Sequence, residues 1–338
     1  MLEPSHPTSR YDLIAALLTG AALITVLFLN LLPALFAGLL VFELVALLSP
    51  LLARAISNQR AKLTAVALLS ILVVTALVAA GIAVAKVLDQ EVGSAAGLFH
   101  KLASLLEDVR NVLPPWLITH LPADSAAFEQ SAGKWLAAHV TQLQIAGTAF
   151  GRGLVKALLG MVIGAMLALH DVQPNHAAGP LAVALRACAI RLAHAFRRVV
   201  FAQVWISTIN ATLTGIFLVV LLPLFGVKLP LVKTMIAITF LVGLLPVIGN
   251  LISNTLITFV ALSISAKVGA AALLFLILIH KLEYFLNARI VGGHINARAW
   301  ELLIAMLVFE SAFGLIGLVA APVFYAYLKD ELRSRALV

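Results

Sequence analysis

The chain has 338 residues, of which 62% are apolar and 11% are charged, and its mean hydropathy is +1.08. Soluble domains are about half apolar and about a quarter charged, so this composition excludes a disordered chain, a disulfide scaffold and most cytosolic enzymes. It indicates a protein that lies in a lipid bilayer. The net charge of +8 is expected from basic cytoplasmic loops, and no aromatic–basic motif indicates nucleic acid as a partner.

Charge-free apolar runs predict an all-α polytopic membrane protein with about eight membrane segments. Asn30 and Pro33 interrupt the first run, which therefore predicts a helical hairpin. The first five spans are predicted at 11–30, 34–53, 63–85, 146–170 and 199–227. Arg152 and Lys156 can snorkel at the outer end of the fourth span.

Residues 89–145 interrupt this pattern with a sequence that is too polar to span a bilayer. Apolar residues at helical spacing predict a first amphipathic helix, with a face formed by Leu98, Leu102, Leu105, Val109 and Val112. After a proline-rich break, a second amphipathic helix is predicted, with an apolar face formed by Phe128, Ala132, Trp135 and Val140. We expect an extracytoplasmic insertion that lies outside the bilayer or flat on it. It separates the first three transmembrane helices, at 1–88, from a C-terminal transmembrane bundle at 146–338.

A basic amphipathic helix is predicted at 176–198, and its positive charge comes from Arg186, Arg191, Arg197 and Arg198. Such a helix normally lies on the cytoplasmic leaflet, and a basic substrate-binding patch is the alternative. When the basic loops are placed inside, both termini are cytoplasmic and the more acidic insertion is outside.

Two apolar segments, 231–266 and 299–328, are longer than one ordinary span and contain helix-breaking residues. Each can be one broken crossing helix or a re-entrant hairpin that returns to its own side. Because more basic residues stay inside when neither segment crosses, we favour two hairpins. One hairpin would open outward and the other inward, as expected of inverted repeats in transporters.

Paired broken segments are the best sequence indication of a transporter's binding site, because unpaired backbone groups at membrane depth need protein or water around them. The candidate substrate-binding residues are Pro246, Gly249, Asn250 and Asn254 in the first segment, and Gly314, Gly317 and Pro322 in the second. Close helix packing is the alternative role of these glycines and prolines. Gln203 and Asn210 share one helical face of the fifth span and could bind substrate or join helices.

Three acidic residues are predicted at membrane depth, namely Glu43, Glu283 and Glu310. A charge at that depth is costly, so it requires a partner or a function, and a buried carboxyl group can exchange a proton near neutral pH. We therefore regard all three as candidate coupling residues for H+ or Na+, with a structural ion pair as the alternative.

No catalytic or metal-binding motif occurs in the sequence, which lacks H-E-x-x-H, G-x-S-x-G and the P-loop pattern. The single cysteine, Cys188, excludes an intrachain disulfide and any cysteine-rich metal site. We therefore expect neither an enzyme nor a bound cofactor.

Three motifs in the C-terminal third, together with the order of the spans, resemble the autoinducer-2 exporter family of PerM-like permeases. The motifs are LLPVIGNLIS at 244–253, HKLEYFLNARIVG at 280–292 and FGLIGLVAAP at 313–322. The resemblance implies a bacterial inner-membrane protein that forms homo-oligomers and acts in autoinducer-2 export or in sodium/proton antiport. By position, the family's motif residues fall on Pro246, Gly249, Glu283, Gly314 and Gly317.

The sequence thus predicts a secondary transporter, an exporter or permease, of a small polar solute such as a signalling molecule, driven by ion or proton gradients or by facilitated efflux. A sodium/proton antiporter is the alternative within the same class. A membrane scaffold that binds partners through 89–145 and 176–198 is the alternative from a different class. Asn250 stands where many family members have proline, as does Ala288, so the resemblance does not identify the solute.

Overall fold

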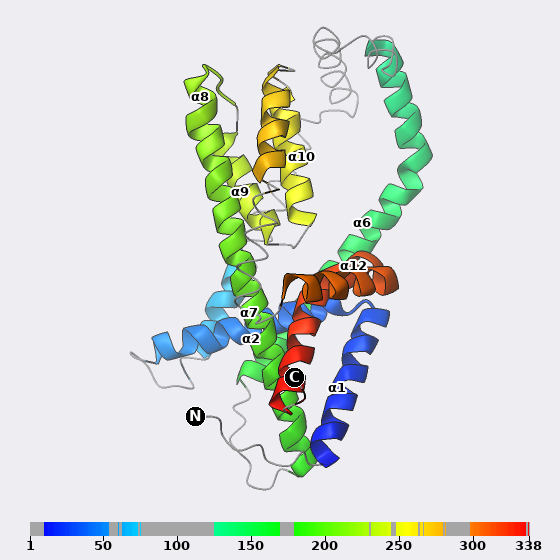
Figure 1. The fold of residues 1–338 in the computed structure, drawn as a ribbon, viewed down its shortest axis with the longest axis vertical. Coiled ribbons are helices and arrows are strands. Elements are labelled where there is room, and N and C mark those ends of the chain that lie inside the picture. The colour runs from blue at the N-terminus through cyan, green and yellow to red at the C-terminus, as the bar shows by residue number, and fades with distance from the viewer. Residues whose placement is uncertain are drawn as a thin grey trace. The chain divides into compact units, whose positions relative to one another are not determined.

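The computed structural model describes residues 10–53, 60, 63–73, 75, 125–169, 179–229, 231–244, 248–262, 264–265, 267–279, 281, 298–335 and 337. These residues form helices and turns, and no β-strand occurs among them. The main elements (Figure 1) are α1 (Arg10–Phe28), α2 (Leu32–Leu52), α6 (Ser125–Leu169), α7 (Pro180–Ile216), the π-helix η1 (Phe217–Leu221), α8 (Leu222–Leu224), α9 (Val232–Gly243), α10 (Ile248–Leu262) and α12 (Ala299–Ser334). Two more apolar helices cover Leu63–Val73 and Lys267–Ile279.

Within the described part of the chain, five helices are long and apolar enough to cross a membrane. Many large apolar side chains lie on the exterior: Leu17 is 65% exposed, Phe150 75% and Met166 64%. A soluble monomer rarely exposes so much apolar surface, whereas lipid solvates it at no cost. The all-helical architecture therefore agrees with the predicted multi-pass helical membrane protein.

The chain divides into two compact units. Unit 1 comprises Met1–Val73, Thr148–Ala202 and Ala288–Val338, and unit 2 comprises Val74–Gly147 and Gln203–Asn287. The divisions that we predicted at residues 88 and 145 stay predictions. The helices α6 and α7 each contain residues of both units.

The turn between α1 and α2 lies where Asn30 and Pro33 predicted it. Asn30 has a φ of 53°, in the left-handed region that asparagine tolerates better than most residues. The Leu31 amide donates to the Val26 carbonyl (2.8 Å) and the Asn30 amide to the Leu27 carbonyl (3.0 Å), which is the Schellman pattern of a helix C-cap. Pro33 then occupies the first turn of α2, where a missing N–H costs little.

α6 and α7 are longer than we predicted. α6 has 45 residues and crosses position 145, where we expected the insertion to end and a span to begin. α7 crosses position 198, so residues 180–198 are the first half of one helix and do not form a separate surface helix. Both predicted boundaries followed a change in polarity, and neither coincides with a proline or another residue that breaks a helix.

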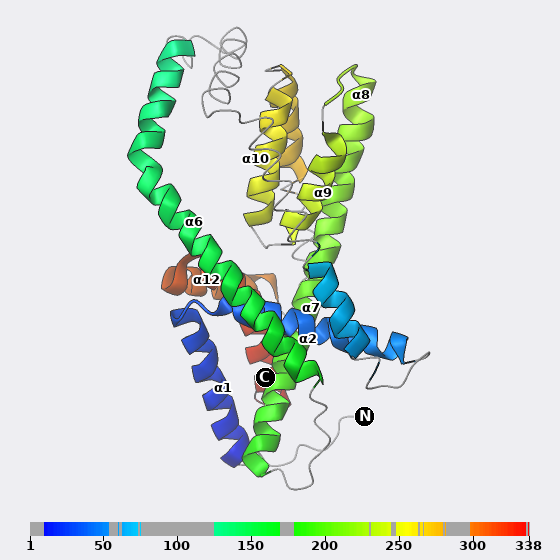
Figure 2. The same cartoon turned by 180° about the vertical axis from the view of Figure 1, so that it is seen from behind.

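The first long segment folds back on itself in unit 2. α9 ends at Gly243, α10 begins at Ile248, and the two helices lie side by side (Figures 1 and 2). Met235, near the start of α9, shares a core with Ile257 and Ala261, near the end of α10. Because the start of α9 packs against the end of α10, the two helices are antiparallel.

The second long segment folds back in unit 1, at Gly314. This residue has a φ of 61° and a ψ of −146° inside α12. On either side of it, Tyr325 Oη donates to Glu301 Oε2 (2.6 Å), and Lys329 forms an ion pair with the same carboxylate. A straight helix would separate the Cα atoms of residues 301 and 325 by ~36 Å. The two halves, 299–313 and 315–334, are therefore antiparallel.

Each unit has its own apolar core. In unit 1, residues of α1, α2, α7 and α12 pack together, with Phe196 and Phe324 among the largest side chains. In unit 2, η1, α9, α10 and the helix Lys267–Ile279 pack together, and the rings of Phe217 and Phe275 stack with their centroids 3.9 Å apart.

Candidate functional site

A row of polar side chains on α7 joins the α9–α10 hairpin in unit 2. Gln203, Ser207 and Asn210 follow one another at spacings of four and three residues, so they lie on one helical face, and we call this row the polar ladder. Its hydrogen bonds run from Gln203 Nε2 to the Gly243 carbonyl (2.7 Å), from Ser207 Oγ to the Phe240 carbonyl (2.5 Å) and from Asn210 Nδ2 to Asn250 Oδ1 (2.7 Å).

Two of these bonds satisfy the end of α9. The last four carbonyls of a helix have no partner within the helix, and Phe240 and Gly243 lie in the last turn of α9. Lipid cannot donate a hydrogen bond to such groups, so Gln203 and Ser207 supply the donors that water supplies in a soluble protein. The polar ladder therefore holds a broken backbone that a bilayer could not satisfy.

The turn of this hairpin also requires close backbone packing. A Cβ atom on Gly249 would lie 2.1 Å from the Val242 carbonyl oxygen, and one on Gly243 would lie 2.7 Å from Ser207 Oγ. Real Cβ atoms essentially never approach other atoms this closely, so a larger residue at 249 would separate α10 from α9, and one at 243 would displace the Ser207 hydroxyl group. Gly249, a candidate binding residue with packing as the alternative, thus has a packing role.

Other buried polar side chains lie on the helices that the polar ladder joins. Asn250, Ser253 and Thr239 are 8%, 0% and 1% exposed. Thr214 lies one turn beyond Asn210, is 1% exposed, and has no hydrogen-bond partner for its Oγ1 among the described residues. A buried hydroxyl without a partner costs about 1–3 kcal/mol. The π-helical turn η1 begins three residues later, and such irregular turns often lie at functional sites.

The structure brings together four of the predicted site residues in unit 2: Gln203, Asn210, Gly249 and Asn250. Asn254 lies one turn further along α10 and is half-buried. Pro246 and Glu283 lie outside the described residues.

The remaining predicted residues belong to unit 1. Gly314 forms the turn of α12, and a Cβ atom on Gly317 would lie 2.0 Å from the Phe309 carbonyl oxygen, so both glycines serve the fold-back. Pro322 is buried in the second half of α12, and Glu310 is exposed on its first half. The buried Glu43 carboxylate lies 3.9 Å from Arg197 Nη1. This contact is a structural ion pair, which was the alternative to a coupling role for Glu43.

Sequence reasoning missed a charged network in unit 1. Glu331 is 5% exposed and accepts hydrogen bonds from Arg191 Nε (2.7 Å) and from Arg335 Nη2 (2.7 Å). Arg198 forms an ion pair with Asp330. We predicted that these arginines of α7 face lipid headgroups or substrate. In the structure, they form ion pairs with carboxylates of α12 instead. The alternating charges in the C-terminal tail are the sequence signal that could have indicated this pairing.

No group of three His, Cys, Asp or Glu residues in the described part of the chain could hold a metal ion. Comparisons with protein-family models, with curated proteins and with solved structures found no match. The resemblance to the autoinducer-2 exporter family stays a prediction that rests on three motifs.

Proposed function

We propose that this chain is a secondary membrane transporter of a small polar solute, and that the polar ladder forms one wall of its binding site. The observation that carries the proposal is the buried amide pair, Asn210 Nδ2 to Asn250 Oδ1 at 2.7 Å, at the break of a folded-back helix. Broken helices in transporters present amide and carbonyl groups to the solute. The spare hydroxyl of Thr214 adds one more group that could bind it.

For orientation, we infer a bacterial inner membrane with both termini in the cytoplasm. Arg335 Nη2 donates to the Asp12 carbonyl (2.5 Å), so the start of α1 and the end of α12 lie together. The ion pairs of Arg191 and Arg198 bring the basic part of α7 to the same end. A concentration of basic residues at one end favours the cytoplasmic side.

In this orientation α12 is a re-entrant hairpin. The ion pair between Glu301 and Lys329 holds its two ends on one side. Its first half, 299–313, is about 22 Å long, shorter than the ~30 Å hydrocarbon core of a bilayer. We therefore infer that the segment 299–328 enters the membrane and returns to the same side.

The proposal is tested by solute flux in liposomes that contain the purified full-length protein. Vesicles are shrunk with erythritol, ribose or autoinducer-2, and their re-swelling is followed by stopped-flow light scattering. We expect faster re-swelling than in empty vesicles for at least one solute. Asn210→Leu and Asn250→Leu should each lose most of this flux, and Thr212→Val, on the exposed face of α7, should keep it.

Two outcomes would contradict the proposal. Flux equal to that of empty vesicles for every solute would favour the non-transporting scaffold. Flux that both leucine variants retain would place the solute path away from the polar ladder. A pH-sensitive dye inside the same vesicles tests the sodium/proton alternative, which requires that a sodium gradient drives proton movement and that Glu283→Gln abolishes it.

A further inference from the structure

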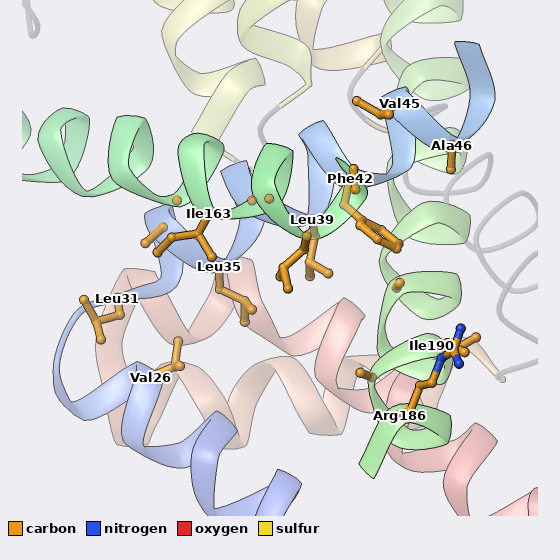
Figure 3. Close-up of a pocket in the computed structure, with 18 of the residues that line it drawn as sticks. Val26, Leu31, Leu35, Leu39, Phe42, Val45, Ala46, Ile163, Arg186 and Ile190 are labelled. Carbon is orange, nitrogen blue, oxygen red and sulfur yellow. The ribbon is translucent and has the colours of Figure 1, made fainter. Parts of the chain in front are cut away.

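Unit 1 contains an apolar cavity that the proposed transport function does not use. It has a volume of about 580 Å³ and lies between α1, α2, α6 and α7 (Figure 3). This volume falls within the ~300–1,000 Å³ of small-molecule sites. The large side chains on its walls include Val26, Leu35, Phe42, Ile163, Leu167 and Ile190. A polar solute would leave its own groups unsatisfied against these walls, so the cavity suits an apolar chain.

The floor of the cavity is formed where the backbones of α2 and α6 touch. A Cβ atom on Gly160 would lie 2.0 Å from the Ala34 carbonyl oxygen, and one on Gly164 would lie 2.1 Å from the Gly38 carbonyl oxygen. All four residues line the cavity. Their small size lets the two helices touch, which fixes the distance between two walls of the cavity.

One end of the cavity is basic. Among the described lining residues, Arg186 is the charged one, and Figure 3 shows it beside Ile190, at the end opposite Leu31. A guanidinium group binds phosphate oxygens through two parallel hydrogen bonds. Arg186 belongs to the part of α7 that we place at the cytoplasmic leaflet, where anionic lipids concentrate.

We propose that this cavity binds one phospholipid with an anionic headgroup. An acyl chain lies in the cavity against the apolar side chains of its walls, and the headgroup phosphate binds Arg186. The proposal does not depend on the transport function, because it rests on residues of unit 1 alone.

Native mass spectrometry of the full-length protein in detergent tests the proposal. The protein is titrated with phosphatidylglycerol or with phosphatidylcholine of the same acyl chains. One positive charge is worth about five-fold in affinity for an anionic lipid, so we expect the wild type to prefer phosphatidylglycerol by about that factor. Arg186→Gln should abolish the preference, and Arg152→Gln, an exposed arginine of α6 outside the cavity, should retain it.

A second variant tests the apolar cavity itself. Ala189→Trp places a large ring in the cavity and should lower the occupancy of both lipids about five-fold, whereas Ala182→Trp, exposed on α7 outside the cavity, should not. Both alanines are exposed, so both variants should fold, which circular dichroism checks. The proposal is overturned if the wild type binds both lipids equally, if Arg186→Gln keeps the preference, or if Ala189→Trp keeps wild-type occupancy. If the wild type forms a dimer and shows no lipid preference, and Ala189→Trp dissociates that dimer, the cavity would instead bind a second copy of the chain.

Discussion

Replacing Gly314 with alanine tests the fold-back of α12. Its φ of 61° and ψ of −146° lie close to a region that is essentially restricted to glycine. A Cβ atom at this position meets no atom within 4 Å, so the methyl group has room and the entire cost arises in the backbone. Such strain costs about 1–3 kcal/mol per residue, and we expect Gly314→Ala to lower the free energy of unfolding by that amount.

Gly20→Ala is the matched control. A methyl group added at Gly20 would likewise meet no atom within 4 Å, but Gly20 lies in the middle of α1 with ordinary helical geometry. In a helix interior, alanine is more stable than glycine by about 0.5–1 kcal/mol. The same chemical change should therefore destabilise the protein at residue 314 and stabilise it at residue 20.

Thermal unfolding in detergent, followed by circular dichroism, measures both changes. For a unit of this size, 1 kcal/mol corresponds to roughly 2–4 °C in Tm. Gly314→Ala should lower Tm by ~2–12 °C and Gly20→Ala should raise it by ~1–4 °C. If Gly314→Ala leaves Tm unchanged or raises it, the backbone strain inferred at this turn is wrong.

A cross-linking measurement tests the same geometry directly. Cysteines replace Glu301 and Tyr325 in a Cys188→Ser background, and a short bifunctional thiol reagent is added. The hydrogen bond between the native side chains (2.6 Å) predicts efficient cross-linking within one chain. A straight helix would hold the two sites ~36 Å apart, so the absence of cross-linking would refute the fold-back.

Three further predictions concern stability. Glu331→Gln removes the buried carboxylate that pairs with Arg191 and Arg335 and should cost about 3–5 kcal/mol, whereas Arg152→Gln, an exposed arginine of α6, should change the free energy of unfolding by less than about 0.5 kcal/mol; equal Tm shifts would contradict this dependence on burial. Gly160→Leu would push a side chain into the backbone of α2, so size-exclusion chromatography should show loss of folded protein, while Gly147→Leu, in open space, should stay folded. Asn30→Ala should cost about 1 kcal/mol in thermal unfolding because alanine disfavours the left-handed region, and Asn30→Gly should not; identical Tm values would rule out this explanation.

Part of the candidate site could be predicted from spacing on one helix. The seven-residue interval between Gln203 and Asn210 predicted a shared face, and both residues contact the α9–α10 hairpin. Ser207 lies between them on that face and escaped prediction, because a serine in an apolar helix commonly bonds its own backbone. Its partner, the Phe240 carbonyl, could not be predicted, since every residue of an apolar segment carries the same carbonyl group.

Composition and local chemistry by themselves determined the helical, membrane-compatible character of this protein and the turn at Asn30, because both depend on residues that are close together in the chain. Only the tertiary structure decided where the charges lie. Arg191 and Glu331 are separated by 140 residues, and their ion pair exists because two helices pack together. The continuity of α7 was likewise decided by tertiary structure, because its basic first half packs against α12 and pairs with the carboxylates of that helix.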